Sequence, residues 1–157
     1  MQATPALRLH HIGFLVTNLE EAAAHYQNNL GYCIESPLID DHGQAATVQF
    51  LRQPSASHWL ELVSPLGARS SLWKALERGT SLHHQCYETV DIATSMNRLR
   101  GNGCMALGHQ QPGAAFDGRP IAWMMDPFKG LIELVQAGDG ARSLAELDRL
   151  NREVVHA

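Results

Sequence analysis

Two histidine pairs, His10-His11 and His83-His84, lie 73 residues apart in the chain (83 minus 10). Two glutamates, Glu61 and Glu133, lie 72 residues apart (133 minus 61). Nearly equal spacing of the same residue types indicates one internal duplication. Imidazole and carboxylate groups together suit zinc, nickel, cobalt, manganese or ferrous iron, and do not suit calcium. The spacing therefore predicts that each half of the chain contributes one histidine and one carboxylate to a shared site.

Strand geometry indicates which histidine of each pair can reach such a site. Side chains alternate between the two faces of a strand, so His11 shares a face with Gly13 while His10 faces the other way. The same alternation separates His84 from His83. We therefore expect His11 and His84 at the site, and we expect His10 and His83 in the core or behind the site residues.

Both glutamates lie within apolar segments, Trp59 to Val63 and Leu131 to Val135. A buried carboxylate without a partner costs several kcal/mol, so a histidine, an arginine or a divalent cation must compensate its charge. A lone strand glutamate usually faces solvent and a lone histidine pair is usually structural, but recurrence in both halves favours a common site. Two neutral imidazoles and two carboxylates form a neutral site with a divalent cation. We predict such a metal site from His11, Glu61, His84 and Glu133.

The elements that must position these residues are predicted in two copies. Strands are predicted at 9–16, 32–38, 45–52 and 58–63, and again at 83–90, 104–109, 119–125 and 131–136. Helices are predicted at 19–30, 70–78, 91–99 and 143–155. Thr17 and Glu20 fit a capping box before the first helix, and Gly31 fits its end. The predicted fold class is α+β, with a first module at 8–66, a linker helix at 67–80, a second module at 81–137 and a C-terminal helix at 138–157.

The composition limits the classes of function. The chain has 157 residues, 45% of them hydrophobic and 18% charged, which is typical of a globular protein. A net charge of −4 argues against nucleic-acid binding, and two lysines cannot form a polybasic membrane patch. We find no apolar run long enough to span a membrane and no secretion signal. Three widely spaced cysteines fit reduced thiols, so we expect a cytoplasmic protein.

Four motifs in this order resemble the vicinal oxygen chelate superfamily (glyoxalase, bleomycin resistance protein and dioxygenase), in particular its methylmalonyl-CoA epimerase and glyoxalase I branch. The motifs are His10 to Val16, Leu60 to Leu62, His83 to Glu88 and Gly130 to Leu134. The resemblance covers about residues 8 to 137 and implies two βαβββ modules that form a curved eight-stranded cleft. The four metal positions of the family match the four residues of the predicted metal site.

The resemblance implies a metal-dependent isomerase or lyase that moves a proton α to a carbonyl group. It implies an acid/base role for Glu133, with Glu61 as a second acid/base, and a contact between Arg119 and the substrate anion. Glutathione hemithioacetals and acyl-CoA thioesters are the implied substrates, and a homodimer is the implied assembly. Glutamate at position 61, where epimerases also use glutamine, favours the ligand set of the glyoxalases.

The sequence departs from the epimerase pattern at two places, and it leaves two alternative functions open. Some bacterial epimerases carry a second catalytic glutamate about three residues after a glycine; counted from Gly43 this position is Ala46, and no carboxylate lies from Gln44 to Arg52. The segment from Asp126 to Gly130 is shorter than its epimerase counterpart. A ferrous ring-cleavage dioxygenase is one alternative, although such enzymes need only one carboxylate ligand. A metal-free protein that binds small molecules such as drugs is the other.

Overall fold

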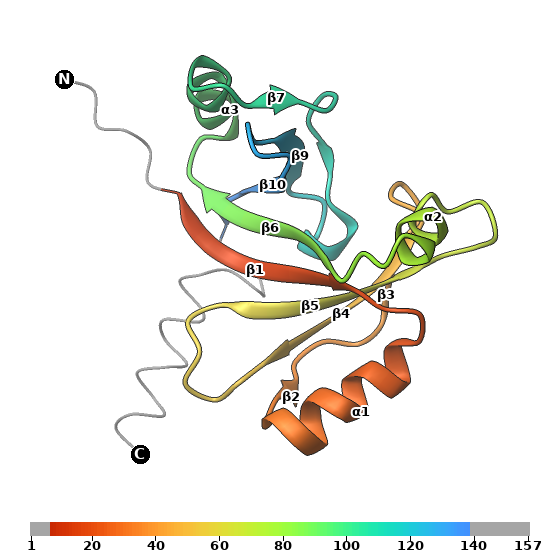
Figure 1. The fold of residues 1–157 in the computed structure, drawn as a ribbon. Coiled ribbons are helices and arrows are strands. Elements are labelled where there is room, and N and C mark those ends of the chain that lie inside the picture. Colours follow the sequence, from red (N-terminus) through yellow and green to blue (C-terminus); the bar gives the residue numbers. More distant parts are fainter. Residues whose placement is uncertain (1–6, 139–157) are drawn as a thin grey trace.

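The computed structural model describes residues 7–138, and these residues form an α+β fold with three α-helices and one ten-stranded sheet (Figure 1). The strands are β1 (Arg8–Leu15), β2 (Cys33–Ile34), β3 (Ile39–Asp41), β4 (Ala46–Arg52), β5 (Trp59–Pro65), β6 (Leu82–Thr89), β7 (Met105–Ala106), β8 (Gln111–Pro112), β9 (Pro120–Met125) and β10 (Leu131–Gln136). The helices are α1 (Leu19–Leu30), α2 (Leu72–Glu77) and α3 (Ile92–Gly101), with a short 3₁₀ turn at Ala114–Phe116. The predicted fold class is confirmed, whereas the helix predicted at 143–155 lies outside the described residues.

The first strands of the two halves meet at the middle of the sheet. The strand order is β2-β4-β5-β1-β6-β10-β9-β7, and Figure 1 shows β1 and β6 side by side between the two halves. β1 and β6 run antiparallel, while each also pairs in parallel with the last strand of its own half, β5 or β10. The four strands that carry the predicted site residues are therefore consecutive in the sheet.

The sheet has ten strands instead of the predicted eight because the second strand of each half is interrupted. β2 and β3 both pair with β4, and β7 and β8 both pair with β9. Pro37 lies in the first interruption and has no N–H to donate to a ladder. Gly108 lies in the second interruption, where its φ of +115° is a conformation that other residues rarely adopt.

Helices α1 and α3 cover the outer face of the sheet, whereas Leu72 of α2 lines the cavity on the other face. In α1, Leu19 and Ala23 pack in one apolar cluster with Leu51, Leu60 and Leu62 of β4 and β5. An equivalent cluster joins α3 to β9 and β10. Asn18, not the predicted Thr17, caps α1, because its side chain accepts a hydrogen bond from the N–H of Glu21. No helix among residues 7–138 is long and apolar enough to cross a membrane.

The pairing of β1 with β6 contains two irregularities, each at a histidine. The register steps from Leu9 to His11 against consecutive residues of β6, which leaves His10 as an extra residue. It also steps from His84 to Leu82 against consecutive residues of β1, which leaves His83 as an extra residue. A bulge interrupts the alternation of side chains, so the expectation that His10 and His83 turn away from His11 and His84 fails at these positions.

Glycine is required where β1 crosses the site. Gly13 is the register partner of His84, and a Cβ atom added at Gly13 would overlap the His84 imidazole. We expect Gly13→Ala to displace this ring and to lower the free energy of unfolding by about 1–3 kcal/mol, measured by urea denaturation. Gly101→Ala at the end of α3, where an added Cβ meets nothing within 4 Å, is the matched control. Equal urea midpoints for the two variants would show that stability does not depend on the close approach of Gly13 and the His84 ring.

Candidate metal centre

Four buried side chains from the four central strands converge on one point. His11 lies on β1, Glu61 on β5, His84 on β6 and Glu133 on β10. Their donor atoms all lie within 4.8 Å of one another. Nε2 of His11 is 3.0 Å from Nε2 of His84, 2.9 Å from Oε2 of Glu61 and 3.5 Å from Oε1 of Glu133. The structure therefore brings together all four residues for which the sequence predicts metal ligation.

The same register produces this arrangement in both halves. Glu61 is the register partner of Gly13, two residues beyond His11 on β1. Glu133 is the register partner of Cys86, two residues beyond His84 on β6. Because residues two apart on a strand share a face, each glutamate projects on the same side of the sheet as the histidine of its own half.

Burial makes both site imidazoles poor bases. It lowers the pKa of His11 to about 3. It also lowers the pKa of His84 to about 3, although the nearby charge of Glu61 acts in the opposite direction. Both rings are therefore neutral at neutral pH, and they offer lone pairs instead of positive charge.

The two glutamates consequently place negative charge in a buried site without a cation among the four residues. The exposed fraction is 6% for Glu61 and 5% for Glu133. Burial raises the pKa of the Glu133 carboxyl well above its ordinary value, and the charge of Glu61 raises it further. Oε1 of Glu133 is buried and has no hydrogen-bond partner within residues 7–138. A divalent cation fits this donor set, because it would use that oxygen and neutralise two carboxylates beside two imidazoles.

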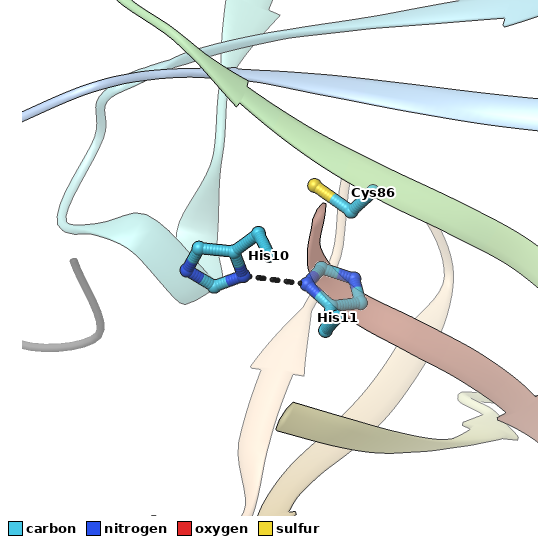
Figure 2. Close-up of side chains that lie close together, drawn as sticks. All are labelled: His10, His11 and Cys86. Carbon is cyan, nitrogen blue, oxygen red and sulfur yellow. Dashed lines mark hydrogen bonds between the residues drawn. The ribbon is translucent and has the colours of Figure 1, made fainter. Parts of the chain in front are cut away.

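Each site imidazole is also held from behind by the neighbouring histidine. Nδ1 of His10 lies 2.8 Å from Nδ1 of His11, and Nδ1 of His83 lies 2.8 Å from Nδ1 of His84. The dashed line in Figure 2 marks the first of these contacts. The bulges in β1 and β6 make these contacts possible. The expectation that the extra histidines face away is wrong, whereas their expected place behind the site residues agrees with the structure.

A cavity of about 350 Å³ gives access to this centre. Glu61, His84 and Glu133 line it, together with Asp41 and Trp123. Asp41 was missed in the sequence because it falls between the strands predicted at 32–38 and 45–52. The structure places it at the end of β3 as the register partner of Ala46, so a carboxylate is present beside the position where the epimerase glutamate is missing.

Arg119 makes its contacts in the segment before β9 and at the end of β10. Its guanidinium donates hydrogen bonds to the backbone carbonyls of Phe116 and Gln136, at 3.2 and 2.8 Å, and it lies over the Phe116 ring. It is not among the residues that line the 350 Å³ cavity. These contacts indicate a role in holding the segment before β9, and its contact with substrate stays a prediction.

Comparisons with known proteins show the family of the chain. Residues 10–123 match the family model of the Glyoxalase/Bleomycin resistance protein/Dioxygenase superfamily. An ethylmalonyl-CoA/methylmalonyl-CoA epimerase of Cereibacter sphaeroides is 37% identical over 134 residues, which cover 82% of this chain and 97% of the relative. The mitochondrial methylmalonyl-CoA epimerase of Homo sapiens is 30% identical over 135 residues, which cover 83% of this chain and 74% of the relative.

A solved structure adds to these relatives. The methylmalonyl-CoA epimerase of Mycobacterium tuberculosis superposes with a TM-score of 0.76 at 26% identity, over 88% of this chain and 93% of the other. The sequence-based resemblance and the prediction of an enzyme are confirmed by these relatives, which are epimerase-type isomerases.

The raised pKa of Glu133 generates a test in the metal-free protein. Above pH 4.5, the ordinary pKa of this carboxyl, the unfolded state has released the proton that the folded state still binds. The group therefore stabilises the fold below that pH, and its contribution to stability is lost as the pH rises. We expect Glu133→Gln in chelator to raise the melting temperature by roughly 2–8 °C at pH 8, with a smaller difference at pH 5.

The control is Glu77→Gln, which changes an exposed carboxylate of α2. Thermal unfolding followed by circular dichroism at several pH values measures both variants. A Glu133→Gln protein that melts below the wild type at pH 8 would contradict the assignment of an uncompensated charge to this carboxylate.

Proposed function

Because the chain belongs to the Glyoxalase/Bleomycin resistance protein/Dioxygenase superfamily, we propose that it is a metal-dependent epimerase of an acyl-CoA thioester such as methylmalonyl-CoA. The observation that carries the proposal is the buried set of two carboxylates and two neutral imidazoles beneath the cavity. The relative with 37% identity, named as an ethylmalonyl-CoA/methylmalonyl-CoA epimerase, supports this choice of substrate.

His11, Glu61, His84 and Glu133 would hold the divalent cation. When bound, such a cation supplies a Lewis acid that polarises the carbonyl oxygens of the substrate and so acidifies the carbon between them. The chain holds both imidazoles neutral by burial, which keeps their Nε2 lone pairs available for ligation. The nitrogen and oxygen donors indicate the group of metals that contains nickel, cobalt, zinc, manganese and iron, and they do not select one of these metals.

Glu133 is the proposed general base. Its carboxyl has a raised pKa, so it binds a proton more readily than an exposed glutamate does. Its Oε1 has no hydrogen-bond partner within the described part of the chain, and its side chain lines the cavity. Glu61 is the residue predicted from the sequence as a second acid/base. It lines the same cavity, and its Oε2 lies 2.9 Å from Nε2 of His11.

Inversion at a carbon requires that a proton leave one face and that another arrive on the opposite face. Asp41 is the carboxylate that the cavity adds to the two glutamates, and it comes from β3 and not from the four central strands. Its Oδ1 accepts a hydrogen bond from the N–H of Gln44, which fixes the side chain. We assign Asp41 as the acid/base partner of Glu133, in place of the glutamate that is absent at Ala46.

A glyoxalase I-type lyase is the second candidate, because Glu61 supplies a second carboxylate to the proposed ligand set. This reaction also moves a proton next to a carbonyl group, with a glutathione hemithioacetal as substrate. A ferrous dioxygenase and a metal-free binding protein fit less well, since the first needs one carboxylate and the second needs no ligands. A homodimer and a cytoplasmic location remain predictions.

Deuterium exchange distinguishes the candidates. We expect protein reconstituted with a divalent metal to exchange the α-proton of methylmalonyl-CoA in D₂O, and chelator to abolish this exchange. Mass spectrometry of the thioester measures the exchange, and the methylglyoxal–glutathione hemithioacetal is assayed in parallel. Turnover of the hemithioacetal alone would contradict the epimerase in favour of the lyase. Full exchange in the metal-stripped protein would contradict metal dependence.

The assignment of Asp41 has its own test. We expect Asp41→Asn to lower the rate of epimerisation about 10²–10⁴-fold, while one epimer still exchanges its α-proton through Glu133. Asp40→Asn is the matched control, because Asp40 is the exposed neighbour whose Oδ1 accepts a hydrogen bond from Thr47. Separate assays of the two pure epimers measure both quantities. Unchanged epimerisation by Asp41→Asn would eliminate this residue as the partner of Glu133.

A further inference from the structure

The back of the proposed metal centre consists of two more histidines. Nδ1 of His10 faces Nδ1 of His11 across 2.8 Å, and Nδ1 of His83 faces Nδ1 of His84 across the same distance. The two rings of each pair are nearly perpendicular, at 81° and 88°. The arrangement occurs once in each half of the chain, always between a bulge residue and the ligand that follows it.

The chemistry of imidazole limits which nitrogen carries the proton. A neutral imidazole has one N–H and one lone pair, and a nitrogen that binds a metal must use its lone pair. Nε2 of His11 and of His84 face each other and the carboxylates, so ligation through Nε2 leaves the proton of each ring on Nδ1. That Nδ1–H then needs an acceptor within the protein, because His11 has no exposed surface and only 3% of His84 is exposed.

We propose that His10 and His83 are positioning residues that accept these Nδ1–H hydrogen bonds and so fix the tautomer and the ring orientation of His11 and His84. The proposal rests on the metal site of the proposed function. Each bulge histidine then carries its own proton on Nε2. Histidine ligands usually donate their second N–H to a carboxylate or a carbonyl, and such partners commonly change metal affinity by 10–100-fold.

The packing around the bulge histidines supports a fixed orientation. The His10 ring lies 4.9 Å from the Trp59 ring and 5.4 Å from the Phe116 ring, and His10 has no exposed surface. On the other side, the ring of Trp123 lies 5.0 Å from His84 and 6.3 Å from His83. Aromatic walls of this kind limit rotation of the imidazoles, so the hydrogen bonds keep one geometry.

A rival interpretation uses some of the same atoms. His10, His11 and Cys86 also offer donor atoms within 4.8 Å of one another, and Figure 2 shows these three side chains together. A second metal ion there would need Nδ1 of His11 as a ligand, and the hydrogen bond to His10 would be lost. None of the three residues lines the cavity of the proposed site, and all three are fully buried. The rival predicts two metal ions per chain, whereas our proposal predicts one.

The test compares two substitutions of His83, which is less buried than His10. His83→Leu removes the acceptor, and His83→Asn keeps an oxygen near the position of Nδ1. We expect His83→Leu to weaken zinc binding 10–100-fold in competition with a chromophoric chelator, and we expect His83→Asn to recover most of the loss. His25→Leu, at an exposed histidine of α1, is the control and should bind zinc as the wild type does.

Nitrogen-15 NMR of the zinc-loaded wild type supplies a second readout. The proposal predicts Nδ1–H in His11 and His84, and Nε2–H in His10 and His83. Unchanged zinc affinity in His83→Leu, an Nδ1–H in His83 or His10, or two zinc ions per chain would each overturn it while the metal site itself stands. A wild type that binds no zinc would overturn the metal site and this inference together.

Discussion

The carboxylates of Glu61 and Glu133 lie within 3.5 Å of the His11 imidazole, where little solvent screens their charge. Histidines that were protonated could balance this charge, but burial lowers the pKa of both His11 and His84 to about 3. Ionisation of both carboxylates would therefore place two like charges beside neutral neighbours, and the raised pKa of Glu133 reflects this cost. Such a site is costly by itself and becomes favourable with a bound cation, so stability and metal affinity are linked here.

Duplication explains how a sheet can bring four such residues together without long loops. Equivalent registers place Glu61 beside β1 and Glu133 beside β6, and the antiparallel contact of these two strands unites the halves. The symmetry is broken where the strands cross, because Gly13 makes room for His84 whereas Cys86 occupies the equivalent place opposite His11. A hydrogen bond joins the Cys86 side chain to Glu133 and favours its charged form, which gives the two glutamates different surroundings.

The sequence predicted those features that depend on residue type and period. The apolar segments around Glu61 and Glu133, the repeated histidines and the helices before Gly31 and after Asp91 all agree with the structure. It did not predict that His10 and His83 turn toward His11 and His84, because a bulge cannot be seen from alternation alone. The place of Asp41 depends on its pairing with Ala46 across β3 and β4, a contact between residues that no local pattern relates to the cavity.

X-ray absorption of the zinc-loaded protein tests most directly whether one ion binds between the two halves. The account predicts a shell of nitrogen and oxygen at about 2.0–2.2 Å, with multiple scattering from two imidazoles and no sulfur. Zinc–sulfur scattering at about 2.3 Å would place the ion at Cys86 and would contradict a centre formed by His11, Glu61, His84 and Glu133.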